Sequence, residues 1–533
     1  MRRTSAHIPS LYKQKSQERK KNMYDLVIKN ARIIDGTGAP WFRADVAVKD
    51  GKIAAMGKIT GEAKEVVDAK DRYLAPGFID IHSHSDDDVL SKGGVFSAPE
   101  CESRILQGVT TDISGNCGSS VAPSAAYPRM RDYFAVLEDL KPSCNMGMLV
   151  GHGNVRAEAM GYDNRKPTEE ELETMRRLVR EAMEDGCFGI SSGLIYPPSS
   201  YADTDELIEV AKAVAPYGGY YATHMRSESL RLIEATKEAL QIAYEANVPL
   251  QISHHKCTRS EFWQVRVLTT TAMIERARNE GLEVLCDQYP YRASATTLSV
   301  NFNDWVFEGG TEAMLQRLRD PETRARIKAE LEADWKGRWQ NLVVSYTLCE
   351  KDVWMSGKSL PEIAEKIGKD CADALIDIVL DAEDKVGELA FGMCEEDIEY
   401  IMKKPYVMTG SDGGAMNLSV GGKPHPRNFG TFVRVLSHYC RDRQLFPIET
   451  AVHKMTGLPA SRLKLEGRGI LKTGMWADLV LFDLAALKDD PSYLDPQQPC
   501  SGILRVYVNG VLTALDGKHT GARAGVVVRR GEG

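Results

Sequence analysis

The expected fold of this chain is decided by the stretch Gly77-Phe78-Ile79-Asp80-Ile81-His82-Ser83-His84-Ser85-Asp86. It has the pattern of a buried strand that ends in polar residues. Because side chains alternate between the two faces of a strand, we expect His82 and His84 side by side at its end. Two imidazoles so placed can bind one divalent metal ion. The stretch therefore predicts a metal site at the end of a strand.

Seven further strand-like runs follow, and polar residues close many of them. They are Val109–Ser114, Met146–Val150, Phe188–Ser192, Gly219–Thr223, Pro249–Ser253, Glu283–Asp287 and Tyr406–Thr409. Helix-like runs lie between strands, at Glu169–Asp185, Thr204–Tyr217, Thr236–Ala246 and Thr270–Glu280. Repeated alternation of this kind predicts a parallel α/β fold, and the polar strand ends favour a closed barrel. Together with Gly77–Ile81 the runs supply the eight strands of a (β/α)8 TIM-like barrel.

The two ends of the chain have a different pattern, with short strands and turns. We expect residues 23–75 and 464–533 to pair into one small β-sandwich, with the barrel, residues 76–463, inserted between them. Late in the barrel an interval too long for one crossover predicts an insertion, and part of it, about 295–340, is predicted to be a lid.

The first 22 residues stand apart from the rest. They hold seven lysines and arginines and a single acid, Glu18, and they lack the apolar core of a signal peptide. We predict a disordered basic extension here. A basic targeting arm, or sequence upstream of a true start at Met23, are the alternatives.

Composition excludes several classes of function. The chain has 533 residues, a formal net charge of −8 and no basic stripe, so we expect no nucleic-acid partner. No apolar run of about 18 residues is present, so we expect no membrane partner. The 11 cysteines are scattered and odd in number, which is typical of a reducing cytoplasm. We expect a small-molecule substrate, and no feature predicts an oligomeric state.

Histidine, cysteine and acidic residues fall repeatedly at the predicted strand ends. In chain order they are His82, His84, Cys117, His224, His254 and Asp412. Alternation favours His254 over His255, which is expected to face the outer helices. Imidazoles and a thiolate suit zinc, which lowers the pKa of bound water toward 7. A nearby carboxylate can take the water's proton and return it to a leaving amine. The set predicts hydrolysis of an acyl or amide-like bond.

At this point the chain resembles the amidohydrolase superfamily and, within it, the D-aminoacylases, which are N-acyl-D-amino-acid deacylases. The resemblance covers nearly the whole chain from Tyr24. Its specific stretches are Ala75–Asp86, Gly115–Gly118, Gly151–Arg156, Ser192–Pro198, Thr223–Arg226, Ser253–Lys256, Asp287–Tyr291, Gly410–Gly413 and His425–Phe432.

The resemblance implies a role for each matching residue. Cys117, His224 and His254 are implied as ligands of a tightly held zinc ion. His82, His84 and Asp412 complete the metal centre, where a second metal binds weakly or not at all, and Asp412 is also implied as the general acid/base. The implied substrate contacts are Lys256 and Tyr289, which would hold the substrate carboxylate, with Arg427 and His152 as further candidates.

Several alternatives stay open at this stage. Dihydroorotases and hydantoinases bridge two metals with a carboxylated lysine on the fourth strand, and the fourth predicted strand of this chain has no lysine. Hydrolysis of a cyclic amide is therefore only the second choice, and a D-dipeptidase is a further alternative. A cysteine hydrolase with Cys117 as nucleophile and His254 as base is a third reading. A non-enzymatic scaffold is disfavoured because every expected ligand is present. Arg292 could reach an acidic substrate side chain, although alternation places it opposite Tyr291.

Overall fold

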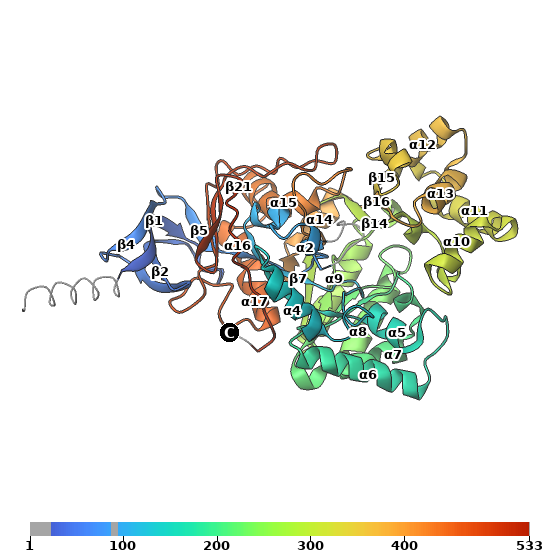
Figure 1. Ribbon diagram of the computed structural model, residues 1–533, viewed down its shortest axis with the longest axis horizontal. Coiled ribbons are helices and arrows are strands. Elements are labelled where there is room, and N and C mark those ends of the chain that lie inside the picture. The colour runs from blue at the N-terminus through green and yellow to red at the C-terminus, as the bar shows by residue number, and fades with distance from the viewer. Residues whose placement is uncertain (1–22, 87–93, 532–533) are drawn as a thin grey trace, which may run out of the picture.

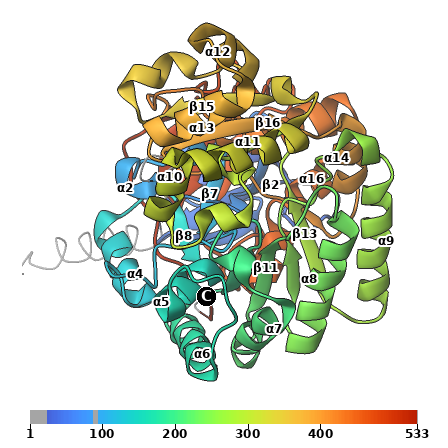
Figure 2. The same cartoon turned by 90° about the vertical axis from the view of Figure 1, so that its right-hand side faces the viewer.

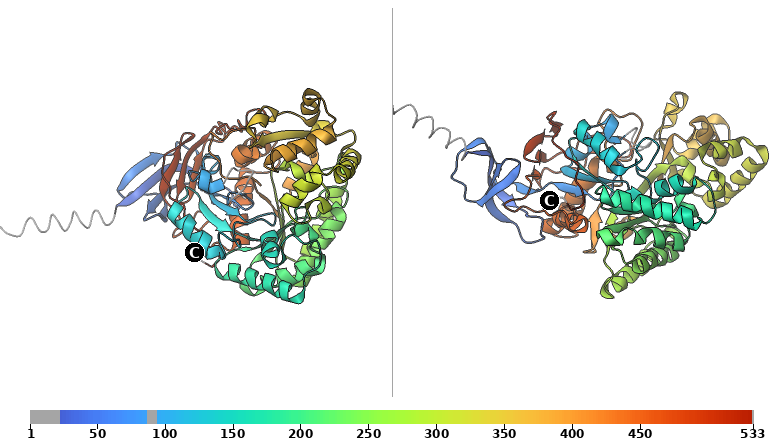
Figure 3. Two further views of the ribbon diagram at one scale, coloured as in Figure 1. Left: turned by 45° about the vertical axis from the view of Figure 1, so that its right-hand side comes forward. Right: turned by 60° about the horizontal axis from the view of Figure 1, so that its bottom comes forward.

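The computed structural model describes residues 23–86 and 94–531, so the predicted extension at residues 1–22 lies outside the described residues. The two ends of the described chain share one nine-stranded sheet. Its strands are β1 (Tyr24–Ile33), β2 (Phe42–Lys49), β3 (Lys52–Gly57), β4 (Ala63–Asp68), β5 (Tyr73–Pro76), β18 (Leu479–Phe482), β19 (Ile503–Val508), β20 (Val511–Leu515) and β21 (Lys518–His519). The N-terminal and C-terminal strands lie side by side (Figure 3).

The join between these two halves is the antiparallel pair β5–β18, in which Leu479 lies opposite Pro76. Apolar side chains from both halves share one buried cluster, which includes Ile33, Val46 and Leu479. The two chain ends therefore build one β domain with a common core, through hydrogen bonds that form one continuous sheet.

Eight parallel strands form a closed (β/α)8 barrel beside the β domain (Figure 1). They are β6 (Phe78–Asp80), β7 (Val109–Ser114), β8 (Asn145–Met148) continued by β9 (Val150–Gly151), β10 (Gly189–Gly193), β11 (Tyr220–His224), β12 (Leu250–Ile252), β13 (Val284–Gln288) and β17 (Val407–Thr409). The last strand meets the first just beyond their ends, where Ser83 pairs with Gly413. Closure brings the strand ends that carry the polar residues to one rim.

Helices cover the outside of the barrel. They are α2 (Gly94–Ser97), α3 (Glu102–Ile105), α4 (Met130–Leu140), α5 (His152–Met160), α6 (Glu169–Glu184), α7 (Thr204–Lys212), α8 (Leu232–Ala246), α9 (Arg266–Asn279), α14 (Glu395–Met402), α15 (Arg427–Arg434), α16 (Ile448–Lys454) and α17 (Gly457–Leu463). The start of α6 is fixed by a capping box, in which Thr168 accepts a hydrogen bond from the backbone of Glu171. No helix among the described residues is long and apolar enough to cross a membrane.

Between β13 and β17 the chain builds a separate small unit, residues 293–391, which we call the inserted unit. It contains β14 (Ala293–Thr297), α10 (Thr311–Arg319), α11 (Pro321–Trp335), β15 (Leu342–Thr347), α12 (Leu360–Ile367), α13 (Cys371–Asp381) and β16 (Val386–Phe391). Its three strands pair in the order β14-β16-β15, and its helices enclose a cluster of their own, including Leu331, Leu360 and Val379. The unit lies across one end of the barrel (Figure 2).

The predicted insertion at about 295–340 covers only the first half of this unit. Its first strand, β14, pairs with β16, which begins 46 residues after position 340, at Val386. The hydrogen bonds that join the two halves are not visible in a linear pattern, so the sequence predicted only the first half as the lid.

Candidate metal centre

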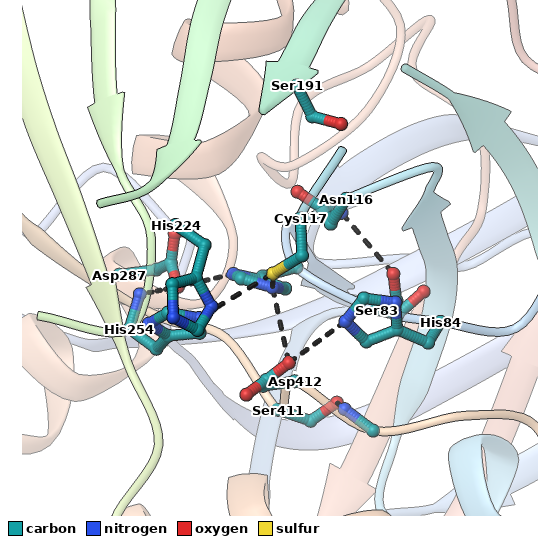
Figure 4. A network of polar contacts seen from close by, with 12 residues as sticks. Ser83, His84, Asn116, Cys117, Ser191, His224, His254, Asp287, Ser411 and Asp412 are labelled. Atoms are coloured by element: carbon teal, nitrogen blue, oxygen red, sulfur yellow. Dashed lines mark hydrogen bonds and ion pairs between the residues drawn. The ribbon is translucent and has the colours of Figure 1, made fainter. Parts of the chain in front are cut away.

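The six predicted ligands come together at the rim of the barrel. They lie at or just after strand ends: His82 and His84 after β6, Cys117 after β7, His224 at the end of β11, His254 after β12 and Asp412 after β17. Figure 4 shows Cys117, His224, His254 and Asp412 pointing toward one another.

The Cys117 thiol stands between imidazoles. Its Sγ lies 3.4 Å from Nε2 of His82 and 3.6 Å from Nε2 of His254. Asp412 Oδ1 lies 3.3 Å from Nε2 of His82 and 3.0 Å from Nε2 of His84. One ligand atom from each of His82, Cys117, His254 and Asp412 falls within 4.8 Å of the others, and all four residues are buried. One thiol, one carboxylate and two imidazoles can thus converge on a single ion.

The ring nitrogens of His224 test whether a metal fits here. His224 is 6% exposed, and among the described residues neither Nδ1 nor Nε2 makes a hydrogen bond, although Nε2 lies 3.5 Å from Oε2 of Glu228. Its ring centroid lies 4.4 Å from that of His254. A buried polar atom without a partner is costly unless something else binds it. A metal ion shared with Cys117 and His254 satisfies the ring, so the residues fit a metal.

Three of these residues hold an unusual backbone conformation. Cys117, His254 and Asp412 have φ values of +53°, +35° and +53°. This left-handed region is unfavourable for residues with a Cβ and costs of order 1–3 kcal/mol each. Backbone strain concentrated in ligands is typical of a functional site.

Glycines allow the Cys117 loop to approach the barrel. A Cβ added to Gly193 would lie 1.9 Å from the carbonyl oxygen of Cys117, and one added to Gly118 would lie 2.5 Å from the backbone nitrogen of Gly193. Neither distance is compatible with a side chain. The glycine after Cys117 is therefore needed to seat the thiol.

The charges around the ligands favour ionised forms. Burial alone would raise the pKa of the Cys117 thiol, but the charge of His82 and the close approach of the His224 and His254 imidazoles outweigh it and lower that pKa well below its usual value. Burial would also raise the pKa of Asp412, yet Arg427, His82 and His254 hold it well below its usual value. A thiolate and a carboxylate are the forms that bind metals.

Two carboxylates that the sequence analysis did not single out orient the imidazoles. Asp287 Oδ1 lies 2.8 Å from Nδ1 of His82 and accepts a hydrogen bond from the backbone nitrogen of His254, also at 2.8 Å. Glu228 Oε1 lies 2.9 Å from Nδ1 of His254. Such partners fix the ring tautomer so that Nε2 faces the metal. Two sequence features could have indicated these roles: Asp287 is an acid at the end of a predicted strand, and Glu228 is an acid four residues after the predicted ligand His224.

We expect Asp287→Asn to weaken metal binding about 10- to 100-fold, because the amide lacks the negative charge that holds His82 and its NH2 group would face Gln251, which now donates to Oδ2 at 2.7 Å. Competition against a chelator of known affinity measures this. Asp478→Asn is the matched control, since Asp478 is a buried carboxylate of the β domain that pairs with Arg468. Unchanged affinity in Asp287→Asn would contradict the orienting role.

Three of the predicted substrate contacts line a cavity beside the ligands. The cavity has a volume of about 860 Å³, and its walls come from the barrel rim and the inserted unit. Lys256 lines it, but its Nζ already donates to Glu228 at 2.6 Å. Arg427 Nη1 donates to Asp412 Oδ2 at 2.7 Å, and its guanidinium lies over the ring of Tyr289 at 5.0 Å. The Tyr289 hydroxyl is buried and has no hydrogen-bond partner in the part of the chain that the structure describes.

The structure places two other candidates away from the cavity. Both ring nitrogens of His152 are occupied, Nδ1 by Ser199 at 2.7 Å and Nε2 by Glu206 at 3.1 Å. His152 is not among the residues that line the cavity, and its ring is held by Ser199 and by Glu206 of α7, so its role as a substrate contact stays a prediction. Arg292 is exposed and lines a separate pocket, donating to the carbonyl of Met393. His255 points outward to Thr270 on α9, as strand alternation predicts.

Comparisons with known proteins agree with this geometry. A sequence model of the amidohydrolase family matches residues 65–514, and one of the urease alpha-subunit N-terminal domain matches residues 8–74. The D-aminoacylase of Alcaligenes xylosoxydans xylosoxydans is 36% identical over 95% of this chain and 98% of its own. The N-acyl-D-glutamate deacylase of Bordetella bronchiseptica, solved with zinc and a phosphonate inhibitor, has a TM-score of 0.80 at 33% identity, covering 95% of this chain and 100% of that one. The L-hydantoinase of Arthrobacter aurescens, at 17% identity and a TM-score of 0.58, covers 95% and 100% and shares the fold.

Proposed function

The chain belongs to the amidohydrolase family, and from that membership we propose that it is a metal-dependent deacylase of N-acyl-D-amino acids. It hydrolyses the amide bond to give a carboxylic acid and a D-amino acid. The observation that carries the proposal is the convergence of His82, Cys117, His254 and Asp412 within 4.8 Å of one another at the rim of the barrel.

We propose zinc as the metal. Cys117, His224 and His254 would hold the tightly bound ion, and His82, His84 and Asp412 would complete the centre, with room for a second ion. The thiolate, the imidazoles and the two ring nitrogens of His224, which make no hydrogen bond among the described residues, support this donor set. A zinc ion held there supplies Lewis acidity, which lowers the pKa of water and polarises the acyl carbonyl.

Asp412 is the proposed general acid/base. Its Oδ2 is held by Arg427 at 2.7 Å, while Oδ1 faces the imidazoles of His82 and His84. The carboxylate accepts a proton from the attacking water and then donates it to the leaving amine nitrogen as the C–N bond breaks. Arg427 fixes the carboxylate in position and keeps it ionised before attack.

Lys256, Tyr289 and Arg427 are the proposed contacts for the substrate carboxylate. Lys256 Nζ lies 5.6 Å from the centroid of the Tyr289 ring, and Arg427 covers the same ring. The unpartnered Tyr289 hydroxyl is a donor that a carboxylate would satisfy. Lys256 forms an ion pair with Glu228, so part of its positive charge is already neutralised before a substrate carboxylate binds.

We also propose a reducing compartment such as the cytoplasm. All eleven cysteines lie among the described residues and none forms a disulfide. Free thiols in this number are typical of proteins that work where disulfides do not persist.

The test is hydrolysis of a panel of N-acetyl-D- and N-acetyl-L-amino acids by zinc-loaded protein, with chelator-treated protein as the control. We expect D-selective release of amino acid that chelation abolishes and zinc restores. Activity that survives chelation would instead support a cysteine hydrolase with Cys117 as nucleophile. Release from no member of the panel, with zinc bound, would contradict the proposed function and favour cyclic amides or D-dipeptides.

A further inference from the structure

A solitary carboxyl group lies in the wall of the cavity. Glu388 of β16 is 3% exposed and lines the cavity, yet it lies in the inserted unit rather than in the barrel. Its one hydrogen-bond partner is Asn301, whose Nδ2 donates to Oε2 at 2.6 Å. Among the residues that the structure describes, no lysine, arginine or histidine forms an ion pair with it. A buried carboxyl with one partner is costly unless a further group binds it.

The strand register places Glu388 between the metal centre and the core of the inserted unit. On the three-stranded sheet Glu388 lies opposite Thr296 of β14 and opposite Val344 of β15, so these three side chains form one row across one face. Thr296 is at the barrel end of the row, because its Oγ1 lies 3.1 Å from the hydroxyl of Tyr196. The Tyr196 ring in turn lies 5.3 Å from the ring of His224.

Neighbouring strands are about 4.8 Å apart, so Glu388 stands one strand further from the metal centre than Thr296. His224, Tyr196, Thr296 and Glu388 all line the same cavity. A substrate whose amide lies at His224, and whose side chain or acyl chain extends through this cavity, would therefore point toward Glu388.

Asn301 is held so that it presents its amide nitrogen to Glu388. Asn301 Oδ1 accepts a hydrogen bond from the indole nitrogen of Trp335 at 3.0 Å, and Nδ2 also donates to the carbonyl of Leu298 at 2.8 Å. Both polar ends of the Asn301 amide are thus used within the protein. Glu388 Oε1 has no partner among these groups and is the atom left for a ligand.

The charges in the wall favour an uncharged ligand group. Burial raises the pKa of Glu388 to about 8, although the hydrogen bond from Asn301 opposes this, so the carboxyl is mostly protonated at neutral pH and can both donate and accept. An anion would be repelled by the ionised fraction of this carboxyl, which no described lysine, arginine or histidine neutralises through an ion pair. A cation would share the cavity with the partly exposed Arg259 and Arg338, which line the same wall.

We propose that Glu388 and Asn301 form a subsite for an uncharged hydrogen-bonding group, a carboxamide or a hydroxyl, at the far end of the side chain or of the acyl chain of the substrate. This subsite rests on the proposed deacylase function. It makes Glu388 a specificity-determining residue on the inserted unit, and it selects N-acyl-D-amino acids such as those of D-glutamine over apolar and acidic ones.

The test compares matched substrates with zinc-loaded wild-type protein. For the side-chain arm the pair is N-acetyl-D-glutamine and N-acetyl-D-methionine, which differ in the terminal carboxamide. For the acyl arm the pair is N-(4-hydroxybutanoyl)-D-alanine and N-pentanoyl-D-alanine, which differ in the terminal hydroxyl. We expect kcat/KM to favour the polar member of one pair at least tenfold, since a hydrogen-bonding site rejects an analogue that leaves it unpaired. N-acetyl-D-glutamate should be poorer than N-acetyl-D-glutamine.

Variants assign the preference to Glu388. Glu388→Met should remove it while leaving hydrolysis of N-acetyl-D-alanine, which is too short to reach the subsite, within about twofold of wild type. Glu388→Gln keeps a donor and an acceptor and should retain most of the preference. Glu332→Gln, on an exposed acid of α11, is the matched control and should change nothing.

Three outcomes overturn the subsite: no preference in either pair, a preference that Glu388→Met retains, or a preference for N-acetyl-D-glutamate. Failure of the proposed function looks different, because zinc-loaded wild type would then not hydrolyse N-acetyl-D-alanine. In that case calorimetric titration with N-acetyl-D-glutamine and N-acetyl-D-methionine still tests the subsite. Equal affinities would overturn it, and tighter binding of the glutamine compound that Glu388→Met abolishes would support it.

Discussion

Replacing Asp412 with asparagine is expected to lower kcat about 10²- to 10⁴-fold in protein that still holds its metal, because an amide has the shape of the carboxylate but cannot accept the proton of the attacking water. Asp412 contacts His82, His84 and Arg427 just after the last barrel strand, so it lies where a water bound at the metal centre would attack the acyl carbonyl. Steady-state kinetics on N-acetyl-D-alanine, with metal content measured in the same samples, gives the result.

Metal content is the essential control for this variant, since Asp412 is also a candidate ligand. Asp334→Asn is the matched substitution, because Asp334 lines the same cavity but is exposed and lies on the inserted unit. It should keep kcat within about twofold. Turnover near that of wild type in metal-loaded Asp412→Asn would rule out the proton-transfer role.

Replacing Cys117 with alanine should remove the metal and, with it, at least about 10³-fold of kcat/KM, which corresponds to the several kcal/mol that a Lewis acid contributes to such a reaction. The thiol is the one soft, negatively charged ligand in the cluster, and His82 and His254 both approach its Sγ. Without the Cys117 thiolate, a metal ion in this buried site would lose a negatively charged ligand that lies between His82 and His254. Metal content after dialysis and kcat/KM on the same preparation are the measurements.

Cys187→Ala is the control for the loss of a buried cysteine. Cys187 is fully buried before β10 and is not part of the cavity wall, so its loss should leave metal content unchanged. If Cys117→Ala kept a full complement of metal but lost activity, Cys117 would be a nucleophile rather than a ligand, and the cysteine-hydrolase reading would replace the present one.

The sequence by itself determined the barrel and which side chains reach its rim. Strand periodicity is local, and parallel strands bring their ends to one edge, so residues as far apart as His82 and Asp412 were predicted to share a site. The choice of His254 over His255 follows from the same alternation, and His255 does face Thr270 on α9. Family resemblance, rather than periodicity, supplied the substrate class and the roles of the individual ligands.

Only the tertiary structure decided which groups pair with one another across the fold. Asp287 contacts and orients His82, which lies 205 positions earlier in the chain, and Lys256 donates a hydrogen bond to Glu228. A linear sequence pattern predicts neither of these pairings. His152 was predicted to contact the substrate because it lies in a stretch that resembles the family, and the structure shows its two ring nitrogens paired with Ser199 and Glu206. Hydrogen bonds and charges act over a few ångströms in space regardless of separation along the chain. Which groups bind a polar side chain is therefore a property of the folded molecule, and so is the position of Glu388 in the cavity wall with Asn301 as its partner.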